Sequence, residues 1–275
     1  MDIRGIKAAA RESLRRADQN PRKLTLLFLL CSLVLSVAYN LISYYVSGSL
    51  ESGLGGLDKL NAYNAADSLL YLVITIFVSL WSCHYQNYAL RLSRGEETSF
   101  RDFTAPFRIL GSVFLLYFLS SLFIGLWSML FVIPGLVASY RYRLAFFALF
   151  DDETISANEA LNRSKFLTYG HKMELLKLDL SFFWYYLLLC IPEVISLWVM
   201  WGIIVIPETL VVPIYLAQML FTLVVQALFL PYVMTAEAHA YNWILGLQRG
   251  SMSQGTPDPN APIQLPPNGG SFGSQ

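Results

Sequence analysis

The feature that most constrains this chain is its series of long apolar runs. The hydrocarbon core of a bilayer is about 30 Å thick, so a helix needs roughly 20 mostly apolar residues to cross it. Because lipid offers backbone groups no hydrogen-bond partners, such runs are expected to be helical. The candidate spans are Leu24–Val46, Leu69–Ala89, Ile109–Ile133, Leu136–Phe150, Phe182–Trp201 and Thr209–Ala236. The sequence therefore predicts an all-α fold, a polytopic transmembrane helix bundle of about six spans with additional cytoplasmic amphipathic helices.

The run Leu136–Phe150 is the shortest of these and carries Arg141 and Arg143. At 1.5 Å per residue it covers only about 22 Å, so a short span and a re-entrant helix are both open. Cytoplasmic flanks of spans collect Lys and Arg. Six spans with both ends inside would place every Lys and Arg except Lys59 in the cytoplasm. We therefore favour a full span, reached through a tight outer hairpin at Pro134-Gly135.

Composition agrees with a lipid environment and excludes several protein classes. Charged residues make up 14% of the chain, against about 25% in soluble domains. Lys and Arg together number 19, as do Asp and Glu, so the basic surplus of a nucleic-acid-binding protein is absent. The expected partner is the lipid bilayer, with other membrane or cytoplasmic proteins as further candidates. The predicted location is the cell membrane, with both termini in the cytoplasm.

The chain divides into a basic N-terminal segment, 1–23, a membrane domain, 24–245, and a tail, 250–275. The tail is rich in Pro, Gly, Ser and Gln, a composition typical of disorder. Residues 3–17 place apolar side chains every three or four positions after Asp2, a suitable N-cap. This pattern predicts an interfacial helix on the anionic inner leaflet; the alternative is an ordinary positive flank. The basic residues expected to contact the leaflet are Arg4, Lys7, Arg11 and Arg15.

A second cytoplasmic helix is predicted over residues 155–170. Ser156 and Glu159 have the spacing of a capping box, and Gly170 is suited to end the helix. We favour a connector that lies on the bundle, with a partner-docking helix as the alternative.

The chain carries no motif of the common soluble enzymes, such as GxSxG, GxGxxG, a P-loop or HExxH. Its histidines, His84, His171 and His239, lack metal-ligand spacing. The cysteines, Cys31, Cys83 and Cys190, all fall inside predicted spans, which argues against a disulfide framework and a thiolate metal site. We expect no catalytic residue, no metal and no cofactor.

Polar residues inside the spans give the one candidate site. Glu193 lies near the middle of the fifth run beside Pro192, and an intramembrane carboxylate is costly enough to suggest a function. The alternatives are a hydrogen bond to a neighbouring helix or a position at the membrane interface. The candidate intramembrane polar residues are Glu193, Gln218, Gln226 and Asn40.

Three runs also carry polar stripes at helical spacing. The stripes are Ser32, Ser36, Asn40 and Ser43; Thr75, Ser79, Ser82 and Gln86; and Gln218, Thr222 and Gln226. Such stripes normally mediate helix packing, which is the interpretation we favour. The alternative is that they line a polar cavity.

Several segments together resemble the domain of unknown function 975 family of bacterial membrane proteins. They are Ile6 to Arg11 (IKAAAR), Phe131 to Gly135 (FVIPG) with Tyr140 to Tyr142 (YRY), Ile155 to Ala160 with Ser164, Gly170 to Lys172 (GHK) with Leu178 to Phe182 (LDLSF), and Pro231-Tyr232 with Thr235 and Tyr241. The resemblance covers roughly residues 1–245 and implies a six-span bacterial membrane protein. It implies no activity.

Two hypotheses of function follow. The favoured one is a non-enzymatic scaffold or accessory subunit that acts through its cytoplasmic face. The alternative is a small transporter or channel that uses the polar helix faces and Glu193. A membrane enzyme ranks third, because no nucleophile and base can be named.

Overall fold

The computed structural model describes residues 1–53, 57–103, 109–202, 204 and 207–253, and over these it contains helices and no strand. The tail, which was predicted to be disordered, lies almost wholly outside the described residues. The side chain of Asn40 also lies outside them. The helices are α1 Ile3–Arg16, α2 Pro21–Gly53, α3 Leu57–Ser93, the 3-10 helix η1 Phe100–Phe103, α4 Leu110–Leu130, α5 Val132–Tyr142, α6 Ala145–Asp151, α7 Ala157–Leu167, α8 Lys172–Leu180, α9 Phe183–Met200 and α10 Glu208–Ser253.

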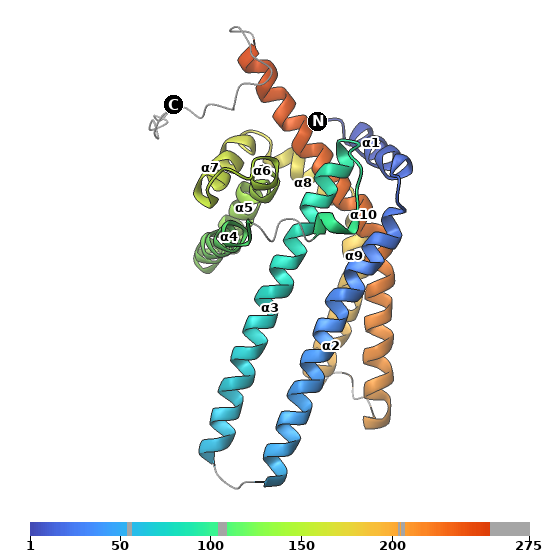
Figure 1. Cartoon of the computed structure of the whole chain (residues 1–275), viewed down its shortest axis with the longest axis vertical. Coiled ribbons are helices and arrows are strands. Elements are labelled where there is room, and N and C mark those ends of the chain that lie inside the picture. The colour runs from blue at the N-terminus through green and yellow to red at the C-terminus, as the bar shows by residue number, and fades with distance from the viewer. Residues whose placement is uncertain (54–56, 104–108, 203, 205–206, 254–275) are drawn as a thin grey trace.

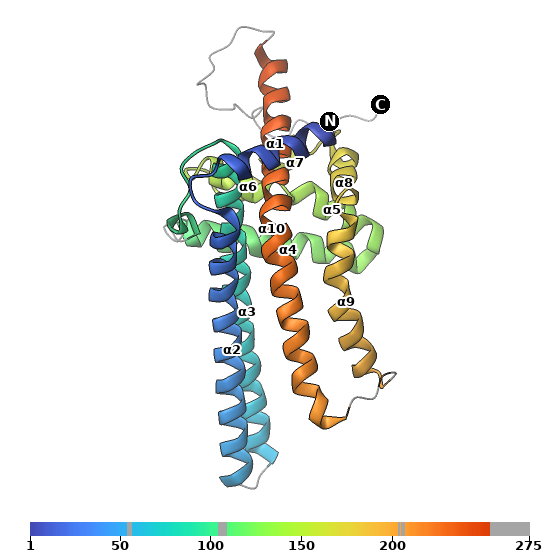
Figure 2. The ribbon, with the colours of Figure 1, turned by 90° about the vertical axis from the view of Figure 1, so that its right-hand side faces the viewer.

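Four helices, α2, α3, α9 and α10, run along the long axis of the molecule (Figures 1 and 2). The remaining helices gather at one end of this bundle, which we call the capped end. Four segments of the described chain are single helices long and apolar enough to cross a membrane: Pro21–Ser43, Asp67–Ser93, Leu110–Leu130 and Pro213–Gln248. A fifth candidate is α8 with α9, a pair bent by 67°. The all-α helical bundle and the integral membrane character are confirmed, whereas the count of six spans is not.

The run Leu136–Phe150 does not form one long helix. It is divided between α5, which ends at Tyr142, and α6, which begins at Ala145. Neither piece reaches the length of a span. The physical reason lies at the break, where Arg143 is held by two carboxylates, one on α8 and one on α10.

The predicted hairpin is present, but its turn lies at Phe131, the extended residue between α4 and α5. Pro134 and Gly135 lie in the first turn of α5. A Cβ atom added to Gly135 would lie 2.7 Å from the Cα of Ser128, so only glycine permits this approach. The hairpin runs across the bundle, because α4 is seen end-on in Figure 1 and lengthwise in Figure 2. The third run is therefore long enough for a span but does not share the direction of α2, α3 and α10.

Most of the buried core lies at the capped end, where α6, α7 and α10 contribute Phe147, Leu161 and Tyr241. By contrast, only between 17% and 28% of each candidate span is buried. Apolar side chains in hydrocarbon gain little from facing one another rather than lipid, so the bundle needs a tight core only beyond the membrane.

Both predicted amphipathic helices form at this end. In α1 the Asp2 carboxylate caps the helix by accepting from the backbone of Arg4, and the apolar face buries Ile6 and Ala10. This face packs on α10, so it meets protein rather than lipid.

The helix predicted over 155–170 is α7, which ends earlier than predicted, at Leu167, whereas its beginning agrees with the sequence signal. Ser156 caps it by accepting from the backbone of Glu159. The Glu159 carboxylate binds Arg163 at 3.2 Å, so only half of the capping box is present. Gly170, the predicted stop, lies two residues beyond the C-cap Thr168 and has a φ of 80°, a value that suits glycine.

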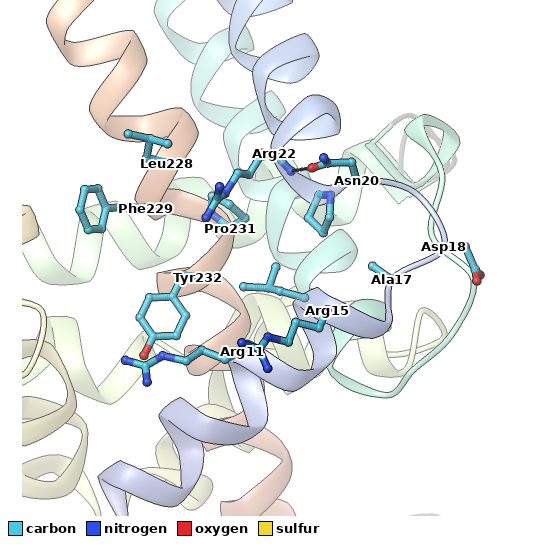
Figure 3. A pocket seen from close by; sticks show the side chains of 12 residues that line it. Arg11, Arg15, Ala17, Asp18, Asn20, Arg22, Leu228, Phe229, Pro231 and Tyr232 are labelled. Carbon is cyan, nitrogen blue, oxygen red and sulfur yellow. Dashed lines mark hydrogen bonds between the residues drawn. The ribbon is translucent and has the colours of Figure 1, made fainter.

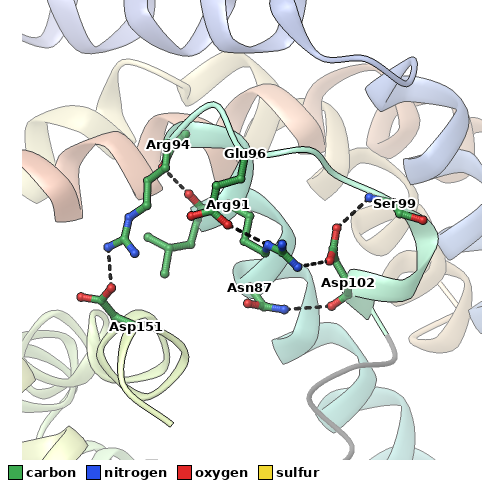
Figure 4. Close-up of polar contacts among 9 residues, drawn as sticks. Asn87, Arg91, Arg94, Glu96, Ser99, Asp102 and Asp151 are labelled. Atoms are coloured by element: carbon green, nitrogen blue, oxygen red, sulfur yellow. Dashed lines mark hydrogen bonds and ion pairs between the residues drawn. The ribbon is translucent and has the colours of Figure 1, made fainter.

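A polar network fixes the segment after α3 (Figure 4). Arg91 binds Glu96 at 2.9 Å and also the carboxylate of Asp102. That carboxylate accepts from the backbone of Ser99 at 2.7 Å, and Asn87 donates to the Asp102 carbonyl at 3.0 Å. These contacts hold η1 against the end of α3.

A neighbouring ion pair connects the turn directly after α3 to α6, since Arg94 binds Asp151 at 2.6 Å (Figure 4). The Tyr241 hydroxyl of α10 donates to the same carboxylate at 3.0 Å. Three helices distant in sequence are thus joined through one acid.

Candidate functional site: a polar groove between α2, α9 and α10

A cavity of about 380 Å³ lies between α2, α9 and α10. These helices run side by side below the capped end (Figures 1 and 2). We call this cavity the polar groove. Its polar lining residues are Ser32, Ser36, Glu193, Ser196, Tyr215, Gln218, Thr222 and Gln226.

The spacing of each helix explains why these side chains converge. Positions three or four apart share one helix face. Ser32 and Ser36 therefore lie on the same face of α2, and both line the groove. Gln218, Thr222 and Gln226 do the same on α10. Two of the three predicted stripes therefore meet in one cavity.

The serines of α2 are already bonded to their own helix. Ser32 donates to the Phe28 carbonyl at 3.2 Å, and Ser36 donates to the Ser32 carbonyl at 3.1 Å. Each hydroxyl donor is therefore used, and the hydroxyl oxygen can still accept. Across the groove, Ser196 donates to the Gln218 side chain at 3.3 Å, which links α9 to α10.

Among the residues that line the groove, Glu193 is the one with an ionisable carboxylate. Its side chain is exposed rather than buried, and it follows Pro192, which lies inside α9. Within the described part of the chain its carboxylate makes no hydrogen bond and no ion pair. The groove can thus offer one carboxylate, two amide groups and several hydroxyls to a polar or cationic ligand.

The structure brings together three of the four residues predicted as the intramembrane site, namely Glu193, Gln218 and Gln226. The fourth, Asn40, has its side chain outside the described residues. The stripe of α3, from Thr75 to Gln86, does not line the groove, and its Ser82 donates to the Val78 carbonyl at 2.9 Å.

Sequence reasoning missed Ser196 and Tyr215, which also line the groove. Ser196 follows Glu193 by three residues, so helical spacing alone could have placed both on one face. Tyr215 precedes Gln218 by three residues in the same way.

The basic residues predicted to contact the leaflet have different surroundings. Lys7 donates to the Ser181 carbonyl at 2.6 Å and lies 4.2 Å from the centre of the Phe182 ring. Burial lowers the pKa of Lys7, and the charge of Arg11 lowers it further. Arg4 is exposed, whereas Arg11 and Arg15 line a second cavity.

Besides the groove and the second cavity, the structure contains an ion-pair cluster around Arg143, which the sequence did not indicate. Its Nη2 binds the Asp179 carboxylate at 2.7 Å and Glu237 at 2.6 Å. Burial alone would lower the pKa of Arg143, but Glu237 and Asp179 outweigh it and raise that pKa above its ordinary value. Tyr140 donates to Asp179 at 2.6 Å. Burial, followed by this contact with Asp179, raises the pKa of Tyr140 to about 12, so the phenol stays protonated.

The three histidines do not converge. His84 contacts the Phe103 carbonyl at 3.1 Å, His171 contacts Glu174 at 2.9 Å, and His239 contacts Ser13 at 2.9 Å. Among the described residues, no group of three His, Cys, Asp or Glu is placed to hold a metal ion. The cysteines Cys31, Cys83 and Cys190 are free.

Comparison with known proteins gives one match. Residues 129–248 match the model of a family described as "Protein of unknown function (DUF975)". No curated protein and no solved structure matches the chain. The matched region contains α5 to α9 and most of α10, and therefore Glu193, Gln218 and Gln226, but not α2. The resemblance predicted from the motifs is thus confirmed over residues 129–248: this part of the chain resembles the DUF975 family of unknown function.

Proposed function

We propose that this integral membrane protein is a small transporter or channel, in which a polar or cationic solute occupies the polar groove, and that it acts without covalent chemistry. The observation that carries the proposal is the convergence of Glu193 with the polar stripes of α2 and α10 on one cavity.

The energetic cost of Glu193 supports a solute over a packing role. An acidic residue at the centre of a spanning helix costs roughly 2.5–3.5 kcal/mol on insertion scales. Packing would be served by neutral residues, and a packing acid would be bonded to a neighbouring helix. Glu193 instead remains exposed in the groove without such a bond.

The size of the groove limits the solute. Sites for small ligands commonly measure about 300–1,000 Å³, and the groove, at about 380 Å³, is at the lower end. The cavity therefore suits a hydrated monovalent cation or a small organic cation, with Glu193 as the charge partner and the two glutamines as further ligands.

We place the protein in the bacterial cell membrane with the capped end and both termini in the cytoplasm. The distribution of Lys and Arg supports this orientation, because nearly all of them fall in segments at or next to the capped end.

A flux assay in liposomes tests the transport proposal. The purified full chain is reconstituted, and potassium, sodium, proton and choline gradients are followed with indicator dyes or labelled solute. We expect flux of one of these cations well above that of protein-free liposomes. We also expect Glu193→Gln to lower this protein-dependent flux at least tenfold. Glu153→Gln is the matched control, since it removes an exposed acid outside the groove. Absence of flux under every gradient, or equal flux in both variants, would contradict the proposal.

A scaffold role is the second proposal, with other membrane or cytoplasmic proteins as partners. It is supported by the exposed apolar side chains of Met173 and Tyr169, which are 63% and 79% exposed on the otherwise tightly packed capped end. A photo-crosslinker at Met173 should capture one defined protein in cells, and Tyr169→Ser should abolish that product. A probe at Val34, on a candidate span, is the control. Capture of the same proteins by the probes at Met173 and Val34, or a product that survives Tyr169→Ser, would argue against the scaffold.

A further inference from the structure

A second cavity, of about 730 Å³, lies where α1 passes into α2 and both meet α10. We call it the basic pocket. Arg11 and Arg15 of α1 lie side by side on one wall, and Arg22 enters from the first turn of α2 (Figure 3). Tyr232, Leu228 and Phe229 of α10 form the opposite wall (Figure 3).

The three arginines of the basic pocket carry charge that the protein does not neutralise. Within the described residues none of Arg11, Arg15 and Arg22 forms an ion pair, whereas Arg16 on the same helix binds Glu12 at 2.7 Å. Asp18 also lines the pocket, but it lies on the side away from Tyr232 (Figure 3). Three like charges repel one another, so an anion between them would stabilise the arrangement.

Tyr232 provides an independent sign of a missing ligand. Its hydroxyl is buried and has no hydrogen-bond partner within the described chain. Buried polar groups are normally bonded, so a hydroxyl of this kind indicates an acceptor that is not part of the protein. Arg11 lies over the same ring, 5.4 Å from its centre, which places a guanidinium beside the unused donor.

The remaining wall of the pocket is apolar and faces outward. Leu228 and Phe229 are 48% and 37% exposed, and both belong to the candidate span Pro213–Gln248. Arg22 lies at the beginning of the candidate span Pro21–Ser43. The pocket therefore lies beside two candidate spans, at the beginning of one of them, with cations on one side and apolar surface on the other.

We propose that the basic pocket binds the phosphate group of an anionic phospholipid. Arginine side chains bind phosphate oxygens with charge-assisted, often bidentate hydrogen bonds, and the Tyr232 hydroxyl donates to a further oxygen. The acyl chains lie against Leu228 and Phe229, which a free phosphate ion would leave uncovered. The pocket shares no lining residue with the polar groove, so this proposal is independent of transport.

Lipid binding to the detergent-solubilised full chain tests the proposal. Fluorescent phosphatidylglycerol is titrated in parallel with fluorescent phosphatidylcholine, which is zwitterionic. We expect saturable binding of phosphatidylglycerol that is at least tenfold tighter. The triple variant Arg11→Gln, Arg15→Gln, Arg22→Gln should lose at least tenfold in affinity. Tyr232→Phe, which removes one hydroxyl and keeps the ring, should lose about threefold, as expected for one hydrogen bond.

The matched control is Arg4→Gln, Lys172→Gln, Lys177→Gln, which removes the same charge from the capped end outside the pocket. We expect it to bind phosphatidylglycerol as the wild type does. Equal losses in the two triple variants would show a diffuse charge effect and overturn the proposal. Displacement of the lipid by millimolar inorganic phosphate would assign the site to a soluble anion and would also overturn it.

Discussion

Arg143 binds the Asp179 carboxylate with both of its terminal nitrogens, although 36 residues separate the two in sequence. The same guanidinium also binds Glu237, which lies 94 residues away. The side chains of all three are mostly buried, with exposed fractions of 20%, 18% and 11%. One cation therefore joins the break between α5 and α6 to α8 and α10.

Arg143→Gln should be strongly destabilising, because it leaves two acidic side chains buried without their partner. Removing one member of a buried ion pair costs about 3–5 kcal/mol, which should lower the melting temperature by about 10 °C for a chain of this size. The shift in melting temperature is measured by thermal unfolding in detergent, monitored by circular dichroism. Arg141→Gln removes an exposed charge two residues earlier and should shift the midpoint by less than about 2 °C. Equal midpoints for the two variants would contradict the role given to the cluster.

This cluster also shows what the sequence could not reveal. Arg141 and Arg143 were visible as charges that interrupt the apolar run Leu136–Phe150, and the run was nevertheless predicted to be a full span. The partners of Arg143 come from α8 and α10, and no local pattern marks a contact between residues so distant in sequence. The ion pairs of Arg143 lie at the break between α5 and α6, and the residues of the fourth run alone do not indicate them.

Gly135→Ala should destabilise the hairpin of α4 and α5. The added Cβ would lie 2.1 Å from the Ser128 Oγ and 2.7 Å from its Cα, and the second of these atoms cannot move without the backbone of α4. Overpacking of this kind costs about 1–3 kcal/mol. Gly125→Ala is the matched control within α4, because nothing lies within 4 Å of its added Cβ.

In the control, alanine's better helix propensity should leave stability unchanged or raise it by up to about 1 kcal/mol. In detergent, Gly135→Ala should therefore lower the melting temperature relative to the wild type, whereas Gly125→Ala should leave it unchanged or raise it. A Gly135→Ala protein as stable as Gly125→Ala would show that the two helices do not approach closely.

Ser156→Ala should fray the beginning of α7, because the backbone of Glu159 loses its acceptor. Loss of an N-cap costs about 1 kcal/mol. Since Ser156 is exposed, no packing change accompanies the substitution. Hydrogen exchange of the α7 amides should speed up about fivefold, while Ser156→Asp, which keeps a capping oxygen, should retain protection. Equal exchange in the two variants would contradict the assigned cap.

Local signals of this kind explain which parts of the fold the sequence predicted well. Asp2 and Ser156 act within a few residues of their own positions, and both cap helices in the structure. Gly170 has the positive φ of a turn but lies two residues beyond the C-cap Thr168. The polar groove was predicted only as separate stripes, because helical spacing assigns residues to a face but does not say which faces meet. Arg22 and Tyr232 were not predicted as site residues for the same reason, because the basic pocket is formed by α1, α2 and α10 together.

The direction of the α4–α5 hairpin gives a prediction about membrane topology. A hairpin that crosses the bilayer twice and a hairpin that lies across the bundle both return the chain to the side from which it left. A reporter fused after Gly170 should therefore indicate the cytoplasm in either arrangement, if the capped end is inside. An external signal at this position would reverse the proposed orientation.

A thiol near the hairpin turn distinguishes the two arrangements. Met129 lies next to the end of α4, and its side chain is 89% exposed. If the hairpin runs across the bundle as in Figure 2, Met129→Cys should not react with a membrane-impermeant maleimide added outside intact cells. Asp58→Cys, between the first two spans, should react and is the positive control, and the parent chain with its three free cysteines gives the background. External labelling at Met129 would restore six crossings, because only a hairpin that traverses the bilayer twice exposes its turn on the far side.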